Sequence, residues 1–80
     1  MIKNYNKIVT IVGAGNIGSA WAALFILNGF KVTLHEKNYE VHQKSKKTIK
    51  KIINLFKESY NLDSKEIRSL INNIDFFFDL

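Results

Sequence analysis

The chain has 80 residues, which is enough for one small domain with a single hydrophobic core. Hydrophobic residues make up 46% of it and aromatic residues 12%, which indicates a packed globular domain and excludes a disordered tail. There is no cysteine, so disulfides and Cys-based zinc sites are excluded, and two isolated histidines indicate no metal site. The net charge of +5 comes mostly from lysine and is compatible with a phosphate-bearing ligand or a nucleic acid.

The amino end is polar over residues 1–7 and is followed by no long apolar run. This pattern predicts neither a secretory signal nor a membrane-spanning helix, so we expect a cytoplasmic protein without a membrane partner. No linker, internal repeat or low-complexity tract divides the chain.

The first elements are predicted from two apolar segments. Residues 7–12 (KIVTIV) are β-branched and apolar at nearly every position, which predicts a strand buried on both faces of a parallel sheet. Residues 16–28 (NIGSAWAALFILN) predict a helix, and Gly29 follows where a left-handed helix cap belongs. The packing face of this helix is predicted to consist of Ile17, Ala20, Trp21, Leu24 and Phe25.

A second strand and a long helix are predicted next. Apolar and polar residues alternate over residues 31–36 (KVTLHE), which completes a βαβ unit with its helix on one face of a parallel pair. A helix is then predicted at about 39–60, with an apolar stripe of Val41, Ile49, Ile52, Ile53, Phe56 and Tyr60. The lysines of this helix lie mostly off the stripe and are predicted to form a solvated face: Lys44, Lys46, Lys47, Lys50, Lys51 and Lys57.

The last segment predicts a capped helix and a third strand. Residues 63–66 (DSKE) resemble a capping box, a short helix follows to about residue 72, and residues 74–78 (IDFFF) predict a strand. The predicted fold class is therefore α/β: a partial Rossmann fold with parallel strands in the order 3-2-1 and a long helical insertion between strands 2 and 3. In this order the first strand is an open edge, because a fourth strand would pair there.

The stretch VGAGNIG at residues 12–18 has the spacing of a dinucleotide-binding turn. Gly13 would let the backbone leave the strand in a tight turn, Gly15 would leave room for a pyrophosphate, and Gly18 would let the helix pack closely on the strands. The N–H groups from Asn16 onward would then face the phosphates at the positive end of the helix dipole. The position of the turn between a strand and a helix supports this interpretation.

Glu36 stands at the end of the second predicted strand, 18 residues after Gly18. A carboxylate there is placed to bind both hydroxyls of an adenosine ribose. It would also repel a 2′-phosphate, which favours NAD over NADP, although Lys37 beside it is a counter-signal. Trp21 is interpreted as a core residue, and no role is assigned to His35.

The run VTIVGAGNIGSAWAALFILNGFKVTLHEKN at residues 9–38 resembles the NAD-binding start of 3-hydroxyacyl-CoA dehydrogenases. It looks closer still to their lambda-crystallin branch, the L-gulonate 3-dehydrogenases. That branch has a similar glycine turn, a Trp-Ala-x-Leu-Phe helix segment and a Gly-Phe before the second strand, here Trp21, Ala22, Leu24, Phe25, Gly29 and Phe30. The resemblance covers essentially the whole chain.

The resemblance implies an oxidoreductase that passes a hydride between NAD and the 3-hydroxyl of a hydroxyacyl-CoA or hydroxyacid substrate, in a dimeric enzyme. It places the backbone of Asn16 and Ile17 at the pyrophosphate and Glu36, where the family more often has Asp, at the ribose. The implied cofactor site consists of Gly13, Gly15, Asn16, Ile17, Gly18 and Glu36.

No catalytic residue and no metal ligand is assigned within the chain. The family's catalytic His–Glu pair, its substrate-binding serine and asparagine, and its helical dimerisation domain lie beyond residue 80. We therefore expect residues 1–80 to be the N-terminal part of a dinucleotide-binding domain that binds NAD weakly if at all and turns over no substrate. Ile52 and Ser59 stand where acyl-CoA members carry polar residues, which weakens a CoA assignment and leaves a free hydroxyacid open.

Two other functions compete with this one. Flavoproteins also begin with a glycine turn, an alanine four residues after the third glycine (here Ala22) and an acid after the second strand, but a glycine-rich stretch usually follows, and residues 39–60 contain no glycine. A basic module that binds nucleic acid or acidic protein through residues 44–51 is supported by charge alone, because no aromatic residue interleaves the lysines. We therefore expect no nucleic-acid partner.

Overall fold

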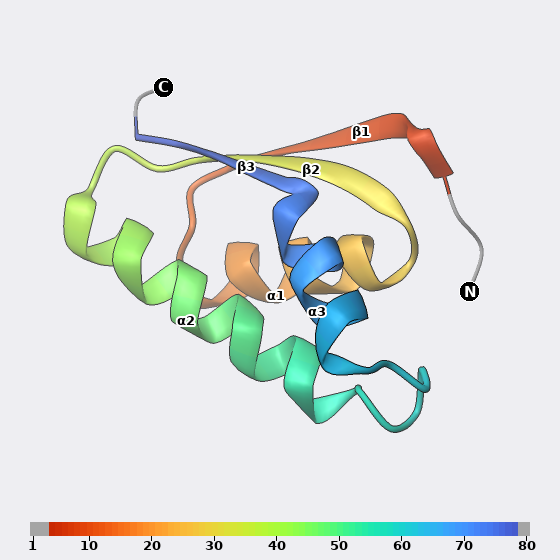
Figure 1. The fold of residues 1–80 in the computed structure, drawn as a ribbon. Coiled ribbons are helices and arrows are strands. Elements are labelled where there is room, and N and C mark those ends of the chain that lie inside the picture. The colour runs from red at the N-terminus through yellow and green to blue at the C-terminus, as the bar shows by residue number, and fades with distance from the viewer. Residues whose placement is uncertain (1–3, 79–80) are drawn as a thin grey trace.

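The computed structural model describes residues 4–78. Three parallel strands form one sheet, and the helices lie together on one of its faces (Figure 1). In chain order the elements are β1 (Asn4–Val12), α1 (Asn16–Leu27), β2 (Phe30–His35), α2 (Tyr39–Leu55), α3 (Ser64–Asn72) and β3 (Ile74–Phe77). The sheet order is β1-β2-β3, so the predicted α/β fold with strands in the order 3-2-1 is confirmed.

The sheet has one covered face and one open face within residues 4–78. Val32 and Leu34 of the central strand β2 are fully buried beneath the helices. On β1, Ile8 and Val12 are 63% and 67% exposed, so the prediction that this strand is buried on both faces is wrong for the described part of the chain. The reason is that the helices here all pack on the same side (Figure 1).

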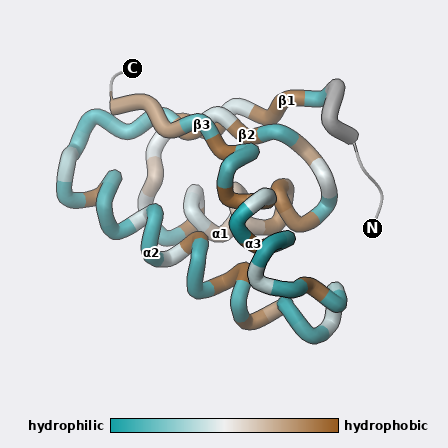
Figure 2. Tube along the Cα trace, in the orientation of Figure 1, coloured by the Kyte–Doolittle hydropathy of each residue, from teal (hydrophilic) through white to brown (hydrophobic). Residues whose placement is uncertain are grey.

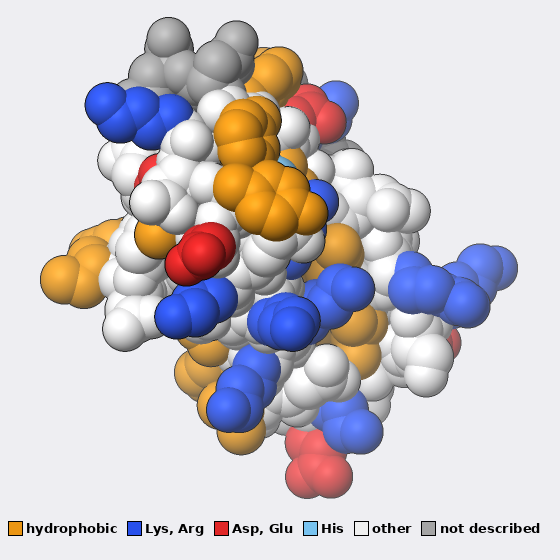
Figure 3. Space-filling model, turned by 90° about the vertical axis from the view of Figure 1, so that its left-hand side faces the viewer, with side chains coloured by type: hydrophobic (Ala, Val, Ile, Leu, Met, Phe, Trp, Pro, Cys, Tyr) orange, Lys and Arg blue, Asp and Glu red, His pale blue; other side chains and the backbone are white. Residues whose placement is uncertain are grey.

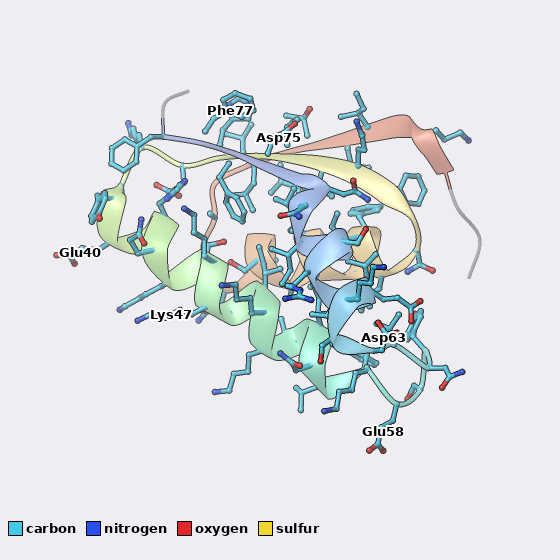
Figure 4. The ribbon with its side chains drawn as sticks, viewed as in Figure 1. Glu40, Lys47, Glu58, Asp63, Asp75 and Phe77 are labelled. Carbon is cyan, nitrogen blue, oxygen red and sulfur yellow. The ribbon has the colours of Figure 1, made fainter. Side chains whose placement is uncertain are left out.

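Asp75 and Phe77 of β3 also point to the face of the sheet that lies away from the helices (Figure 4). His35 of β2 shares that face, and it is half-buried because its ring stacks on Phe77 at 4.7 Å between ring centroids. The open face is therefore a mixed surface of aliphatic, aromatic and polar side chains. No function is assigned to it by the sequence.

The packing face of α1 differs from the predicted one. Ile17 and Trp21 are 77% and 54% exposed, so the interpretation of Trp21 as a core residue is wrong. The buried face consists instead of Ser19, Ala22, Ala23, Ile26 and Leu27. Small side chains on that face let α1 approach both the strands and α2 closely, whereas the larger Trp21 is accommodated at the surface, stacked on Phe25 at 5.8 Å.

The long helix α2 is shorter than predicted and ends at Leu55 instead of at about residue 60. The chain turns through residues 56–61, where Asn61 has a positive φ of 56°, and Tyr60 and Leu62 thereby pack against the core. The predicted stripe holds for Ile49 and Ile53, which are buried. It is wrong for Phe56, which is 38% exposed at the end of the helix.

The predicted solvated face of α2 is present. The helix is mainly hydrophilic along its outer side (Figure 2), and Lys and Arg side chains gather across the face of the molecule seen in Figure 3. Lys47 points away from the sheet (Figure 4), and Lys44, Lys50 and Lys51 are likewise exposed. Lys46 is half-buried, because its Nζ lies 5.2 Å from the centroid of the Phe76 ring.

The shorter elements confirm two predicted local motifs. Asp63 and Glu66 form a complete capping box at the start of α3. Gly29 follows α1 with a φ of +86°, and its N–H donates to the Ile26 carbonyl at 3.0 Å, as a left-handed cap requires. No helix in residues 4–78 combines the length and apolar character needed to cross a membrane.

Candidate functional site

The carboxyl ends of β1 and β2 bring the glycine turn and Glu36 together. Glu36 Oε1 accepts a hydrogen bond from the Ala14 N–H at 2.8 Å, and its Oε2 accepts one from the Asn38 N–H at 2.7 Å. The Gly13 N–H donates to the His35 carbonyl at 2.8 Å. The glycine turn and Glu36, both predicted from the sequence, are thus joined by hydrogen bonds at this edge of the sheet.

Two of the three glycines are required by the chain itself. Gly13 has a φ of +90°, a backbone conformation that other residues rarely adopt. A Cβ at Gly18 would overlap the carbonyl oxygen of Gly13, so only glycine allows α1 to lie this close to the turn. Gly15 differs from both, because its φ of −69° suits any residue and a Cβ there would point into open space.

The start of α1 is open toward that space. Gly15 occupies the N-cap position without a side-chain hydrogen bond, and the first turn of the helix contains no acidic residue. Asn16 and Ile17 are both exposed. Unpaired N–H groups and the positive end of the helix dipole make such a helix start a place where an anion can bind.

Glu36 provides a negative charge beside this positive helix start. The hydrogen bonds from the Ala14 N–H and then the Asn38 N–H lower the pKa of its carboxyl group below the ordinary value. The group is therefore ionised at neutral pH. Each of its oxygens uses one acceptor position for the backbone and keeps another, so the carboxylate can still accept hydrogen bonds from two hydroxyl groups.

A pocket of about 200 Å³ separates the turn from α2. Its walls are Ala14, Gly15, Asn16 and Ser19 on one side and Val41, Lys44, Ser45 and Thr48 on the other. The sequence did not indicate that α2 forms part of the site, because helical spacing alone does not say which turn of α2 meets the glycine turn. The only sign in the sequence that α2 contributes to the site was Ser45, a polar residue among the apolar residues on the buried face of that helix.

His42 is a second polar residue of α2 that the sequence did not identify as buried. It is 6% exposed, both ring nitrogens lack a hydrogen-bond partner, and its ring packs edge-on against Phe76 and Phe78. Burial, followed by the charge of Lys46, lowers its pKa below the ordinary value. The imidazole is therefore neutral at neutral pH and belongs to the core that holds β3 against α2.

Solved structures share this fold. FadB2 of M. tuberculosis superimposes with a TM-score of 0.76 at 22% identity over 91% of this chain and 25% of its own. A diketoreductase superimposes with a TM-score of 0.78 at 23% identity, over 91% of this chain and 26% of its own. The 3-hydroxybutyryl-CoA dehydrogenase of Escherichia coli K12 superimposes with a TM-score of 0.73 at 15% identity, over 100% of this chain and 16% of its own. The chain thus spans at most about a quarter of their lengths, and at these identities the likeness establishes the fold.

The family follows from the sequence match. No curated protein is significantly similar to the chain. Residues 8–80, however, match the family described as 3-hydroxyacyl-CoA dehydrogenase, NAD binding domain. This match disfavours both the flavoprotein and the basic-module alternatives and agrees with the glycine turn, the open start of α1 and Glu36. The chain belongs to the family of NAD-binding domains of 3-hydroxyacyl-CoA dehydrogenases.

Proposed function

We propose that the chain binds the adenosine and pyrophosphate half of NAD, as the N-terminal part of the dinucleotide-binding domain of an NAD-dependent 3-hydroxyacid dehydrogenase. The observation that carries the proposal is the uncapped start of α1 beside the ionised carboxylate of Glu36. Bound NAD would exchange a hydride with the 3-hydroxyl carbon of the substrate. The chain's own contribution is to bind and orient the cofactor.

The N–H groups of Gly15, Asn16 and Ile17 would hold the pyrophosphate, and the remaining acceptor positions of Glu36 would hold the ribose hydroxyls. Open space in front of Gly15 lets the phosphates approach the backbone. The negative charge of Glu36 would repel a 2′-phosphate, which favours NAD over NADP.

A titration of the chain with ADP-ribose, followed by amide NMR shifts, tests the proposal. We expect weak binding with shifts concentrated at residues 13–18 and 36–38. ADP-ribose that carries a 2′-phosphate is the matched control and should bind more weakly. Shifts that avoid the glycine turn would contradict the proposal, and sub-micromolar NAD binding by the monomeric chain would contradict the view that half of the cofactor site lies elsewhere.

We also propose that the enzyme belongs to the lambda-crystallin branch and acts as a dimer on a free hydroxyacid. The support is the Trp21–Phe25 helix segment, together with an apolar Ile52 on α2 and an uncharged Ser59 in the turn that follows, at the two positions where acyl-CoA members carry polar residues that contact CoA. An assay of the longer polypeptide that would contain this chain distinguishes the substrates. We expect oxidation of a free 3-hydroxyacid such as L-gulonate, whereas a clear preference for 3-hydroxybutyryl-CoA would overturn the branch assignment.

A further inference from the structure

Successive peptide units of the glycine turn are held by β2, by Glu36 just after it and by α1. The Gly13 N–H donates to the His35 carbonyl of β2, and the Ala14 N–H donates to Glu36. The Ala14 carbonyl accepts a hydrogen bond from Ser19 Oγ of α1 at 3.2 Å. The turn is therefore fixed before any ligand arrives, by contacts on both sides of Ala14.

Ser19 is in turn bonded to Ser45 of α2, with 2.8 Å between the two Oγ atoms. Both side chains are 1% exposed, so water does not compete for these bonds. A serine hydroxyl has one proton, and Ser19 donates its proton to the Ala14 carbonyl. Ser45 must therefore be the donor to Ser19, and its hydrogen bond polarises and strengthens the one that Ser19 makes.

The direction of the Ala14 carbonyl determines the direction of the next N–H. In a planar trans peptide, the C=O of one residue and the N–H of the next point in opposite directions. Because Ser19 holds the Ala14 carbonyl toward the buried side, the Gly15 N–H points the opposite way, toward the exposed side of the turn. A rotation of this peptide unit would turn that donor away from an incoming phosphate.

We propose that Ser45 is a positioning residue for dinucleotide binding. It acts through Ser19 to hold the Ala14–Gly15 peptide so that the Gly15 N–H faces the pyrophosphate. This inference rests on the proposed function, since it requires that a dinucleotide binds at the turn. It adds a residue of α2 to a site that the sequence pattern confines to the glycine turn and Glu36.

A double-mutant cycle tests the proposal. The dissociation constant for ADP-ribose is measured by NMR titration for the wild-type chain and for Ser45→Ala, Ser19→Ala and the double variant. We expect each single change to weaken binding by roughly two- to tenfold, the effect of one lost hydrogen bond. Because Ser45 acts through Ser19, the double variant should bind about as weakly as Ser19→Ala alone.

Ser69→Ala is the matched control, because it makes the same change at an exposed serine of α3, which contacts neither the pocket nor the Ser45–Ser19–Ala14 hydrogen bonds. It should leave the dissociation constant within about twofold of wild type. Ser45→Cys retains a side chain of similar size with a weaker donor, so it should bind with intermediate affinity. Thermal melts of every variant report folding separately, and Ser45→Cys serves if Ser45→Ala does not fold.

The outcomes separate this inference from the proposed function. If wild-type chain shows no ADP-ribose shifts at the turn, the proposed function fails. If the wild-type chain binds there and Ser45→Ala binds equally well, the positioning role of Ser45 is refuted. It is also refuted if Ser45→Ala weakens binding by the same factor in the Ser19→Ala variant as in the wild-type chain. A lowered melting temperature with unchanged affinity for Ser45→Ala also refutes it, since Ser45 would then only stabilise the packing of α2.

Discussion

The start of α1 and the starts of α2 and α3 satisfy their first backbone N–H groups in different ways. At α2, the Asn38 side chain accepts a hydrogen bond from the Val41 N–H at 3.1 Å. At α3, Asp63 accepts from the Glu66 N–H at 2.8 Å, and the Glu66 side chain accepts from the Asp63 N–H at 3.2 Å. At α1, Gly15 offers no side chain and no acid follows in the first turn.

This difference supports our proposal that the start of α1 is the helix end that binds a ligand. Glycine at the N-cap stabilises a helix by only a few tenths of a kcal/mol less than asparagine or aspartate does, so α1 gives up little stability by lacking a side-chain cap. The same absence leaves the first N–H groups of α1 available to an anion, and no acidic side chain of its first turn repels that anion. A capped helix start is therefore structural in this chain, whereas the uncapped one is where we place the pyrophosphate.

The largest expected effect comes from giving α1 the kind of start that α3 has. Gly15→Asp would cap α1 and place a negative charge where we expect the phosphates. Binding of ADP-ribose should fall by roughly tenfold or more, while the stability of the fold changes by only a few tenths of a kcal/mol. NMR titration and urea unfolding measure the two quantities. Gly15→Asn, which caps without charge, should lose less affinity, and undiminished binding by Gly15→Asp would contradict the placement of the pyrophosphate at the start of α1.

Gly18 and Gly15 should differ in what an added methyl group costs. Gly18→Ala forces a Cβ against the Gly13 carbonyl oxygen, so we expect the free energy of unfolding to fall by about 1–3 kcal/mol, as overpacking typically does. Gly15→Ala places the methyl group in open space and should cost less than about 1 kcal/mol, because alanine is a poorer N-cap than glycine. Urea unfolding of both variants checks this order, and equal losses would contradict it.

Asp63→Ala should destabilise the fold without affecting the cofactor site. The loss of the hydrogen bond from the Glu66 N–H and of the capping box should lower the free energy of unfolding by about 1 kcal/mol. Because α3 lies outside the glycine turn and the pocket beside it, ADP-ribose binding should be unchanged. A change in affinity would contradict this expectation, because it would show that the start of α3 is coupled to the glycine turn.

The smallest expected effect is a pH dependence that originates in the first turns of α2. Burial lowers the pKa of His42 below its ordinary value of 6.5, so the unfolded chain takes up a proton more readily than the folded one. Stability should be greatest above about pH 6.5 and decline as the pH falls toward the lowered pKa. Melting temperatures of wild type and His42→Leu between pH 8 and pH 5 test this. A decline of the same size in His42→Leu would assign it to other groups.

A second loss of stability is expected at lower pH from Glu36. Its pKa lies below the ordinary value of 4.5, because the Ala14 and Asn38 N–H groups favour the ionised form. The stabilisation by this carboxylate is therefore present above about pH 4.5 and is lost as the pH falls through the lowered pKa. Protonation of Glu36 would also weaken the hydrogen bond that its carboxylate accepts from the Ala14 N–H of the glycine turn.

Local patterns predicted most of the helices and strands. β-branched runs mark the strands, Gly29 ends α1, and the spacing from Asp63 to Glu66 marks the start of α3, because each depends on residues adjacent in the chain. The packing face of α1 was predicted wrongly because that helix is apolar on nearly every side. Periodicity cannot select a face there, and the small residues that allow close approach decide it instead.

The order of strands and helices, the glycine turn and the acid after β2 could be read from the sequence, since they depend on backbone preferences and spacing. Ser45 of α2 reaching Ser19, the buried His42 with no hydrogen-bond partner and the exposed Trp21 became apparent only in the folded chain. The physical reason is that such contacts join residues far apart in the chain. They depend on how closely α1 and α2 pack, which no single segment specifies.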